Sequence, residues 1–473
     1  MSIAFGRFRT PSLLVSRWDS GRRFANMSRT TWFIGVFMLW CCASVASLEE
    51  VRGEELKSAA GEQPELRLTL KDAMEAALDK SPNVKLFKER IAAARAVVST
   101  QLGAMLPNLS SNVRQTRQTL FLGTLGLVPQ VTNPFSIFDA RANLTQNLFS
   151  MSLIDRWRAS RSALQVAELE SDATRFDTMA EVALAYMEVL RAEAALKARE
   201  TNVKLFGELT DLARSRRGGG MGGGLDTARA QAQLENERQQ VAILRNEVQR
   251  HKLNLLYVLG IADDVKLTLL DELKSDVAAV PSAQESLVSA LQDRLEMKAQ
   301  QQRIRTAELA LRSTVMERLP SLSAQGDYGL IGNRVHNTGE TYNVGVFLSV
   351  PIFDGGQREG RISESRSLAQ QELLKLTVIQ NKVTLEVREA VATLQSAQEQ
   401  LMIARNGLES AIQEQEIARE RFTVLTSASN FELTNALFSI ARARENAVDA
   451  LFRLNASRVN FARATGHLEH LYK

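Results

Sequence analysis

The chain has 473 residues, of which 45% are hydrophobic and 24% charged, so it can bury a core and is not disordered as a whole. Its formal net charge of +4 comes from residues 1–47, where six arginines and one acid give +5 and leave −1 for the rest. The basic isoelectric point therefore gives no argument for a nucleic-acid partner.

Residues 1–47 are predicted to be an N-terminal extension and an export signal. A basic stretch that includes Arg22 and Arg23 precedes an apolar run over residues 32–43, and small residues at 44–46 would permit cleavage. The apolar run is shorter than the roughly 20 residues that a membrane helix needs. The mature chain is therefore expected to leave the cytoplasm.

Both cysteines of the chain, Cys41 and Cys42, lie in this leader, so we expect no disulfide and no thiol chemistry in the mature protein. Lipidation at Cys42 is an alternative that the bulky Trp40 disfavours. Met1 and Met27 both stay open as translation starts.

The remainder of the chain repeats itself. Residues 77–110 align with residues 290–323 without a gap at an offset of 213, and residues 148–149 align with residues 352–353 at an offset of 204. A period of about 210 residues is too long for a solenoid. The chain is therefore predicted to be a duplicated domain.

Each half is predicted to run helix, strand, strand, long helix, turn and return helix. The first repeat covers residues 66–262, the second covers residues 286–468, and residues 263–285 form an equatorial linker between them. The expected elements are strands at about 107–123 and 136–149, a long helix at about 152–216 and a return helix at about 226–259, then strands at about 320–332 and 341–353, a long helix at about 357–420 and a return helix at about 431–464.

The long helices carry the strongest periodic signal. Residues 152–216 contain a single glycine and no proline, and as one helix they would be roughly 98 Å long. In the second half, apolar residues separated by three and four positions form a coiled-coil seam. Its members are Leu376, Ile379, Val383, Val387, Ala390, Leu394, Ala397 and Leu401. A purely structural coiled-coil protein is one interpretation of this pattern.

The strands alternate apolar and polar residues in the manner of transmembrane β-strands, and each has about the 9–11 residues that cross a bilayer. The residues expected to face lipid in the last strand are Tyr342, Val344, Val346 and Leu348. Four strands cannot close a barrel, and open sheet edges are not tolerated in lipid. The chain must therefore oligomerise if it spans, and the spacing alone does not choose between three and four copies.

Several motifs resemble those of one family. Leu-Pro pairs open the first strand of each half within residues 106–109 and 319–322, and the stretch Val-Pro-Ile-Phe-Asp-Gly-Gly at residues 350–356 resembles that family's exit from its last strand. Residues 216–230 and 421–436 resemble its two hairpin turns. Over nearly the whole mature chain, the sequence resembles the TolC-like outer membrane efflux family.

The resemblance implies a mainly α fold with transmembrane β-strands. In a homotrimer, a 12-stranded β-barrel in the outer membrane would stand on a long α-helical barrel in the periplasm. The chain would be a passive channel subunit, not an enzyme and without a cofactor, in tripartite efflux or type I secretion. Its partners would be outer-membrane lipid, a periplasmic adaptor and an inner-membrane pump of the RND or ABC type. The substrate class stays open: drug, metal ion or polypeptide.

A periplasmic adaptor is the alternative from another class, but it should show a lipoyl-like β domain and one hairpin. The resemblance places adaptor docking at the hairpin tips. The tip residues are Arg217, Gly220, Met221, Gly224, Leu225, Phe422, Leu425 and Ser429. The first tip is unusually rich in glycine, and Leu425 stands where the family usually has glycine.

Asp226 and Glu432 occupy equivalent places at the start of the two return helices. The family often keeps acids that constrict the periplasmic mouth there, but acids are also favoured by the dipole at any helix start. Asn435 stands at the family's second acidic position. The pair His467 and His470 is better explained as a solvated tail than as a metal site, and we expect no catalytic constellation.

Overall fold

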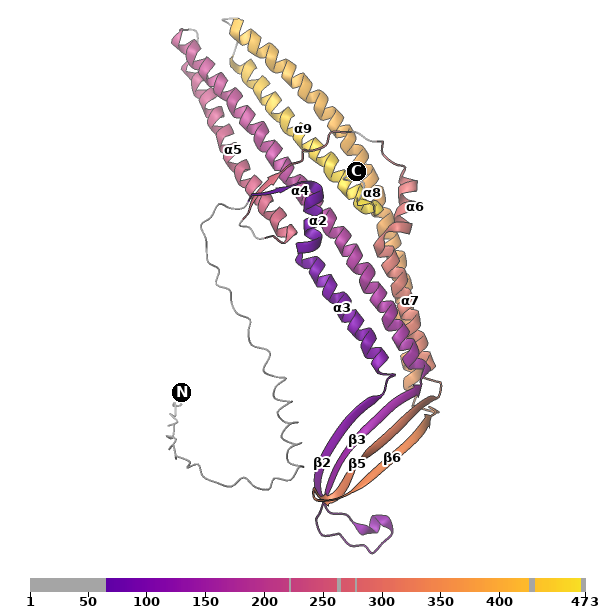
Figure 1. Cartoon of the computed structure of the whole chain (residues 1–473). Coiled ribbons are helices and arrows are strands. Elements are labelled where there is room, and N and C mark those ends of the chain that lie inside the picture. The colour runs from indigo at the N-terminus through magenta and orange to yellow at the C-terminus, as the bar shows by residue number, and fades with distance from the viewer. Residues whose placement is uncertain (1–64, 221–222, 262–264, 277–278, 425–429, 469–473) are drawn as a thin grey trace, which may run out of the picture. The chain divides into compact units, whose positions relative to one another are not determined.

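The computed structural model describes residues 65–468 except 221–222, 262–264, 277–278 and 425–429 (Figure 1). The predicted leader lies outside the described residues. The elements are β1 (Glu65–Leu68), α2 (Leu70–Lys80), α3 (Pro82–Gly103), β2 (Asn108–Gln118), η1 (Leu122–Leu125), β3 (Phe135–Phe149), α4 (Met151–Gly218), α5 (Gly224–Leu259), β4 (Lys266–Leu269), α6 (Ala283–Asp293), α7 (Leu295–Met316), β5 (Ser321–Arg334), β6 (Asn337–Ser349), α8 (Gln357–Val424) and α9 (Asn430–Thr465).

The two halves have the same helices. Helices α2 and α6 each have 11 residues, α3 and α7 each have 22, α4 and α8 each have 68, and α5 and α9 each have 36. The first two pairs are offset by 213 residues and the last two by 206. The long helices thus have a different offset from the pair of residues 148–149 and 352–353, in which Phe149 ends β3 whereas Phe353 lies beyond the end of β6.

The single helix expected before the first strand of each half is two helices. Ser81 and Arg294, at equivalent positions, both adopt an extended ψ near 130° and end the first helix, and Pro82 then begins α3. Proline is suited to the first position of a helix because its missing N–H would be unpaired there in any case. Gly260, with φ of 69°, packs against this break, where a Cβ would lie 2.9 Å from the carbonyl oxygen of Lys80.

The four-stranded sheet joins the two halves. Its order is β2-β3-β5-β6, all antiparallel, so the seam between the repeats is the β3–β5 pair (Figure 1). The strand expected to reach residue 123 ends at Gln118, where the chain folds into a compact loop. The strand expected over 341–353 is Asn337–Ser349, since Pro351 cannot donate to a ladder.

The long helices pack through small and branched apolar residues. The predicted seam of α8 is confirmed: its central members, from Val383 to Leu401, are buried against α6 and α9. Leu454 of α9 is fully buried in the same contact. A second apolar cluster near the hairpin tips joins α4, α5, α8 and α9. Among the described residues, none of the helices combines the length and apolar character that a bilayer crossing requires.

Residues 263–285, expected to be a plain linker, contribute Asp271 to a set of hydrogen bonds around Tyr186, which we call the Tyr186 clasp. Strand β4 of this linker pairs in parallel with β1, so the linker is joined to the start of the first half. The carboxylate Oδ2 of Asp271 accepts hydrogen bonds from the Leu70 backbone N–H at 2.7 Å and from the Tyr186 hydroxyl at 3.0 Å. The same hydroxyl lies 3.1 Å from the carbonyl oxygen of Leu68. Burial and the hydrogen bond with Asp271 raise the pKa of Tyr186, so the phenol stays protonated and donates.

The Tyr186 clasp should contribute to stability. Tyr186 is fully buried, so Tyr186→Phe removes the hydroxyl donor from the Asp271 carboxylate, which keeps the Leu70 N–H, and should lower the free energy of unfolding by about 1–3 kcal/mol. Tyr257 is 81% exposed, and Tyr257→Phe is the matched control that should change nothing measurable. Thermal unfolding followed by circular dichroism compares the two. Equal melting temperatures for both variants would contradict a stabilising role for the clasp.

Candidate functional site

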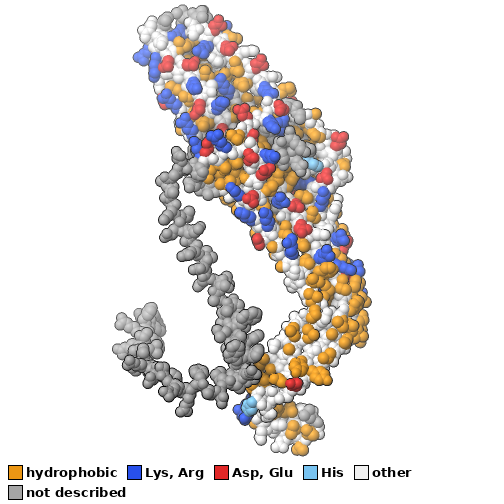
Figure 2. All heavy atoms as spheres, in the orientation of Figure 1, with side chains coloured by type: hydrophobic (Ala, Val, Ile, Leu, Met, Phe, Trp, Pro, Cys, Tyr) orange, Lys and Arg blue, Asp and Glu red, His pale blue; other side chains and the backbone are white. Residues whose placement is uncertain are grey.

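The sheet has one apolar face and one polar face, and the strand register carries both faces across all four strands. Val344 pairs with Gly326, Gly326 with Leu144, and Leu144 with Leu109, so these residues share the apolar face. Val344 is 78% exposed, and the other residues predicted to face lipid in β6 are exposed beside it. Figure 2 shows the apolar side chains gathered over the strands, while charged side chains cover the helices.

The polar face is built around an ion-pair cluster. Arg141 of β3 donates to Asp139 at 2.7 Å and to Asp327 of β5 at 3.1 Å, so the cluster bridges the seam between the repeats. Asp327 pairs in register with Asn343 of β6. Such charges have no place against hydrocarbon, and they identify this face as the one that needs water. The two faces predicted from alternation within single strands therefore agree across the sheet.

The first hairpin tip lies between α4 and α5. Arg217 and Leu225 are exposed on either side of it, and Gly220 adopts a left-handed φ of 74° that favours glycine. Gly224 is the first residue of α5 and lies close to the guanidinium of Arg217. Met221 lies outside the described residues.

The second tip differs from the expectation at Phe422. This residue is only 5% exposed and belongs to the apolar cluster near the tips, so its ring is not presented to a partner. The guanidinium of Arg216 lies 4.3 Å from the ring centroid and donates to the Phe422 carbonyl oxygen at 3.2 Å. The pair thereby ties the end of α4 to the end of α8. Leu425 and Ser429 lie outside the described residues.

The candidate mouth residues occupy equivalent positions. Asp226 and Glu432 are the third residues of α5 and α9, each in the first helical turn. Asp226 is half-buried, whereas Glu432 is exposed. Asn435 is exposed one turn further along α9. All three lie near the tips, at the end of the helices away from the sheet (Figure 1).

Polar contacts between the two helical hairpins lie along α4 and α9. Arg199 of α4 contacts both carboxylate oxygens of Glu237 on α5 at 3.1 Å and also pairs with Glu445 on α9. Arg444 of α9 donates to Asn202 of α4 at 3.1 Å, and burial lowers the pKa of Arg444. Charged contacts thus hold the first hairpin to the return helix of the second.

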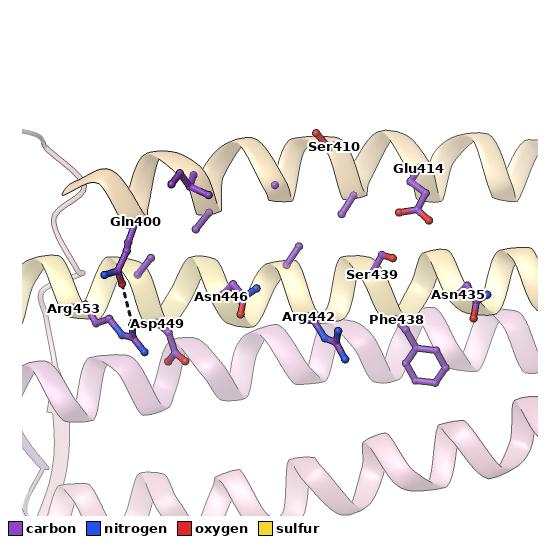
Figure 3. A pocket seen from close by; sticks show the side chains of 16 residues that line it. Gln400, Ser410, Glu414, Asn435, Phe438, Ser439, Arg442, Asn446, Asp449 and Arg453 are labelled. Carbon is purple, nitrogen blue, oxygen red and sulfur yellow. Dashed lines mark hydrogen bonds between the residues drawn. The ribbon is translucent and has the colours of Figure 1, made fainter. Parts of the chain in front are cut away.

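A groove of about 810 Å³ follows the α8–α9 hairpin, and the sequence analysis missed it. Figure 3 shows its mainly polar lining, with Gln400 accepting from Arg453 at 2.9 Å. The polar residues that α9 contributes step by four and three: Asn435, Ser439, Arg442, Asn446, Asp449 and Arg453. This heptad spacing of polar residues is the sequence pattern from which the groove could have been predicted. Among the described residues, no cluster of His, Cys, Asp and Glu could hold a metal ion.

A protein-family model described as outer membrane efflux protein matches residues 73–261 and 286–467. The chain is 25% identical over 389 residues to outer membrane protein TolC of Vibrio cholerae, covering 80% of this chain and 82% of that protein. It is 24% identical over 377 residues to outer membrane efflux protein BepC of Brucella suis, covering 74% and 81%. The solved CmeC outer membrane channel of Campylobacter jejuni has the same fold, with a TM-score of 0.74, 18% identity and coverage of 84% and 85%.

The Arg199 contacts should matter more than an exposed ion pair. Glu237 is 4% exposed, so Arg199→Gln leaves a buried carboxylate without its partner and should destabilise the protein by about 3–5 kcal/mol. The Arg245–Glu200 pair, also from the first hairpin, is largely exposed, and Arg245→Gln should cost less than about 1 kcal/mol. Denaturant unfolding in detergent measures both. A loss for Arg199→Gln no larger than that for Arg245→Gln would show that the contacts carry no structural weight.

Proposed function

Because the chain belongs to the outer membrane efflux protein family, we propose that it is the passive channel subunit of a tripartite efflux or type I secretion system. It is an outer membrane channel homologue whose helices extend into the periplasm. The single observation that carries the proposal is the sheet with one apolar and one charged face, attached to long helical hairpins. A sheet of this kind suits a wall between lipid and water.

The proposal requires three copies. Among the described residues, the outer edges of β2 and β6 have no partner strand, and an open edge in hydrocarbon costs several kcal/mol for each unsatisfied backbone group. Joining β6 of one copy to β2 of the next satisfies both edges. Two copies would give eight strands, which leave no room for a passage, whereas three would give twelve and a lumen. The resemblance to trimeric channels supports three over four.

In this arrangement the chain only conducts. The hairpin tips, with Arg217 and Leu225 exposed, would receive a periplasmic adaptor, and an inner-membrane pump of the RND or ABC type would supply the energy. Asp226 and Glu432 would line the periplasmic mouth, where Asn435 adds no charge. The polar stripe of α9 suits a water-filled passage, which supports transport of hydrated cargo. Neighbouring genes would identify the cargo class, because the pump selects it.

The face assignment tests the proposal directly. Val344→Arg would place a charge against hydrocarbon and should cost roughly 2–4 kcal/mol per copy near the bilayer midplane, which reduces the trimer recovered from outer membranes. Asn343→Arg, the neighbour on the charged face, should assemble normally, since its new charge lies beside Asp327 in water. Membrane fractionation and electrophoresis in mild detergent measure the trimer.

Two outcomes would overturn the proposal. The first is wild-type chain recovered as a soluble periplasmic monomer. The second is equal loss of trimer in both variants, which would mean that neither face meets lipid.

A further inference from the structure

The two loops at the end of the sheet away from the helices are unlike each other. Strands β5 and β6 are joined by a tight turn in which Val335 and His336 stand between Arg334 and Asn337. Strands β2 and β3 are joined by a long loop, residues 119–134, which carries η1 (Figure 1). None of the sequence patterns that support the proposed function involves this long loop.

This loop is folded and hydrogen-bonded within itself. The Leu122 backbone N–H donates to the Gln130 carbonyl oxygen at 2.9 Å, and the Thr132 N–H donates to the Leu120 carbonyl oxygen at 2.8 Å. The ring of Phe121 lies over Gly123, where an added Cβ would meet it at 2.6 Å. The loop therefore has a defined shape and presents defined side chains.

The loop is apolar and exposed to solvent. No charged residue occurs between Arg117 and Asp139. The exposed large apolar side chains of the loop are Leu120, Phe121, Leu127, Val128 and Val131, and Val128 is the most exposed at 71%. Figure 2 shows apolar side chains on this part of the chain. A contiguous exposed apolar surface of this kind marks an interaction site.

The strand register shows which face of the sheet adjoins the apolar surface of the loop. On the charged face, the β3 positions next to the loop are apolar: Phe135 and Ile137 follow Asp139 toward the loop end, where they pair with Gln118 and Thr116 of β2. The charges of this face thus end before the loop, and β3 continues it with two apolar side chains.

The apolar face does the reverse. Its last row before the loop is polar, Arg117 paired with Ser136, and the next row pairs Gln115 with Phe138. A band of polar residues therefore separates the loop from the surface assigned to lipid. Through Phe135 and Ile137 of β3, the apolar surface of the loop is continuous with the lumen side, whereas Arg117 and Ser136 separate it from the lipid side.

We propose that the residue 119–134 loops of three copies lean over the barrel opening and pack on one another through Val128 and its apolar neighbours, forming an apolar cap at the outer mouth. The partner surface is a second copy of this chain. This inference rests on the proposed trimeric channel and adds the closure of its outer end.

The dimensions permit the contact. Twelve strands about 4.8 Å apart and tilted about 40° give a barrel radius of about 12 Å. The middle of a 16-residue loop can extend up to about 26 Å from the strand ends, about twice this radius, so the chain length suffices even when part of it is folded. The short β5–β6 turn has no such reach, and equivalent turns stay about 20 Å apart on the rim.

Cross-linking in the outer membrane tests the cap. The full chain carries Val128→Cys together with Cys41→Ser and Cys42→Ser, so that residue 128 supplies the only thiol, and cells are treated with a short bismaleimide. Cross-linked dimers should appear on denaturing gels, because each chain supplies one thiol and each reagent joins two thiols. The matched control, Val335→Cys in the same background, is also exposed but sits in the short turn, and should give no cross-linked species.

Failure of the inference and failure of the proposed function look different. If Val128→Cys purifies as a trimer in mild detergent but gives no cross-link, and a fluorophore at residue 128 is quenched by brominated lipid, the loop lies in the membrane and the cap is overturned. If a trimer forms with neither cross-link nor quenching, the loop stands in water and the cap is likewise overturned. If no trimer forms, the proposed channel fails, and the cap fails with it.

Discussion

The open edges of the four-stranded sheet are the constraint on which the rest of this structure depends. Water can satisfy the backbone groups of β2 and β6 in a soluble protein, but hydrocarbon cannot. In the outer membrane, each copy must therefore pair its edge strands with the edge strands of other copies. The duplicated halves contribute equally to this solution, because each supplies two strands and one long helical hairpin, and the sheet joins them at the β3–β5 seam.

The helices next to the sheet are arranged in the same order as its strands. Four chain segments leave or enter the sheet, and α3, α4, α7 and α8 continue from its strands in the sheet's own order. Arg141 fixes the seam on the charged face, the Tyr186–Asp271 clasp fixes the middle of the helices, and the Arg199 contacts fix the two hairpins to each other nearer the tips. These polar links all join the first half of the chain to the second or to its linker, so the repeats act as one wall.

Much of this architecture could be predicted from the sequence because it is periodic. The heptad of α8 and the alternation in β6 depend on local spacing alone, and both are present as expected. The β1–β4 pair and the Tyr186 clasp could not be predicted, since each depends on contacts between residues far apart in the sequence. The break at Ser81 is different, because the residue before a proline is biased away from the helical conformation. Phe422 was expected at a docking surface, but its burial under Arg216 is a tertiary contact that no local pattern reports. The groove along α9 follows a heptad of polar residues, a local pattern from which it could have been predicted.

The number of copies in the membrane-bound particle tests the central claim most directly. Native mass spectrometry of the mature chain released from lipid nanodiscs would measure it without labels or variants. The account predicts one dominant species with three times the mass of the mature chain, because twelve strands are the smallest closed number here that leaves a passage. A dominant monomer, dimer or tetramer would contradict it.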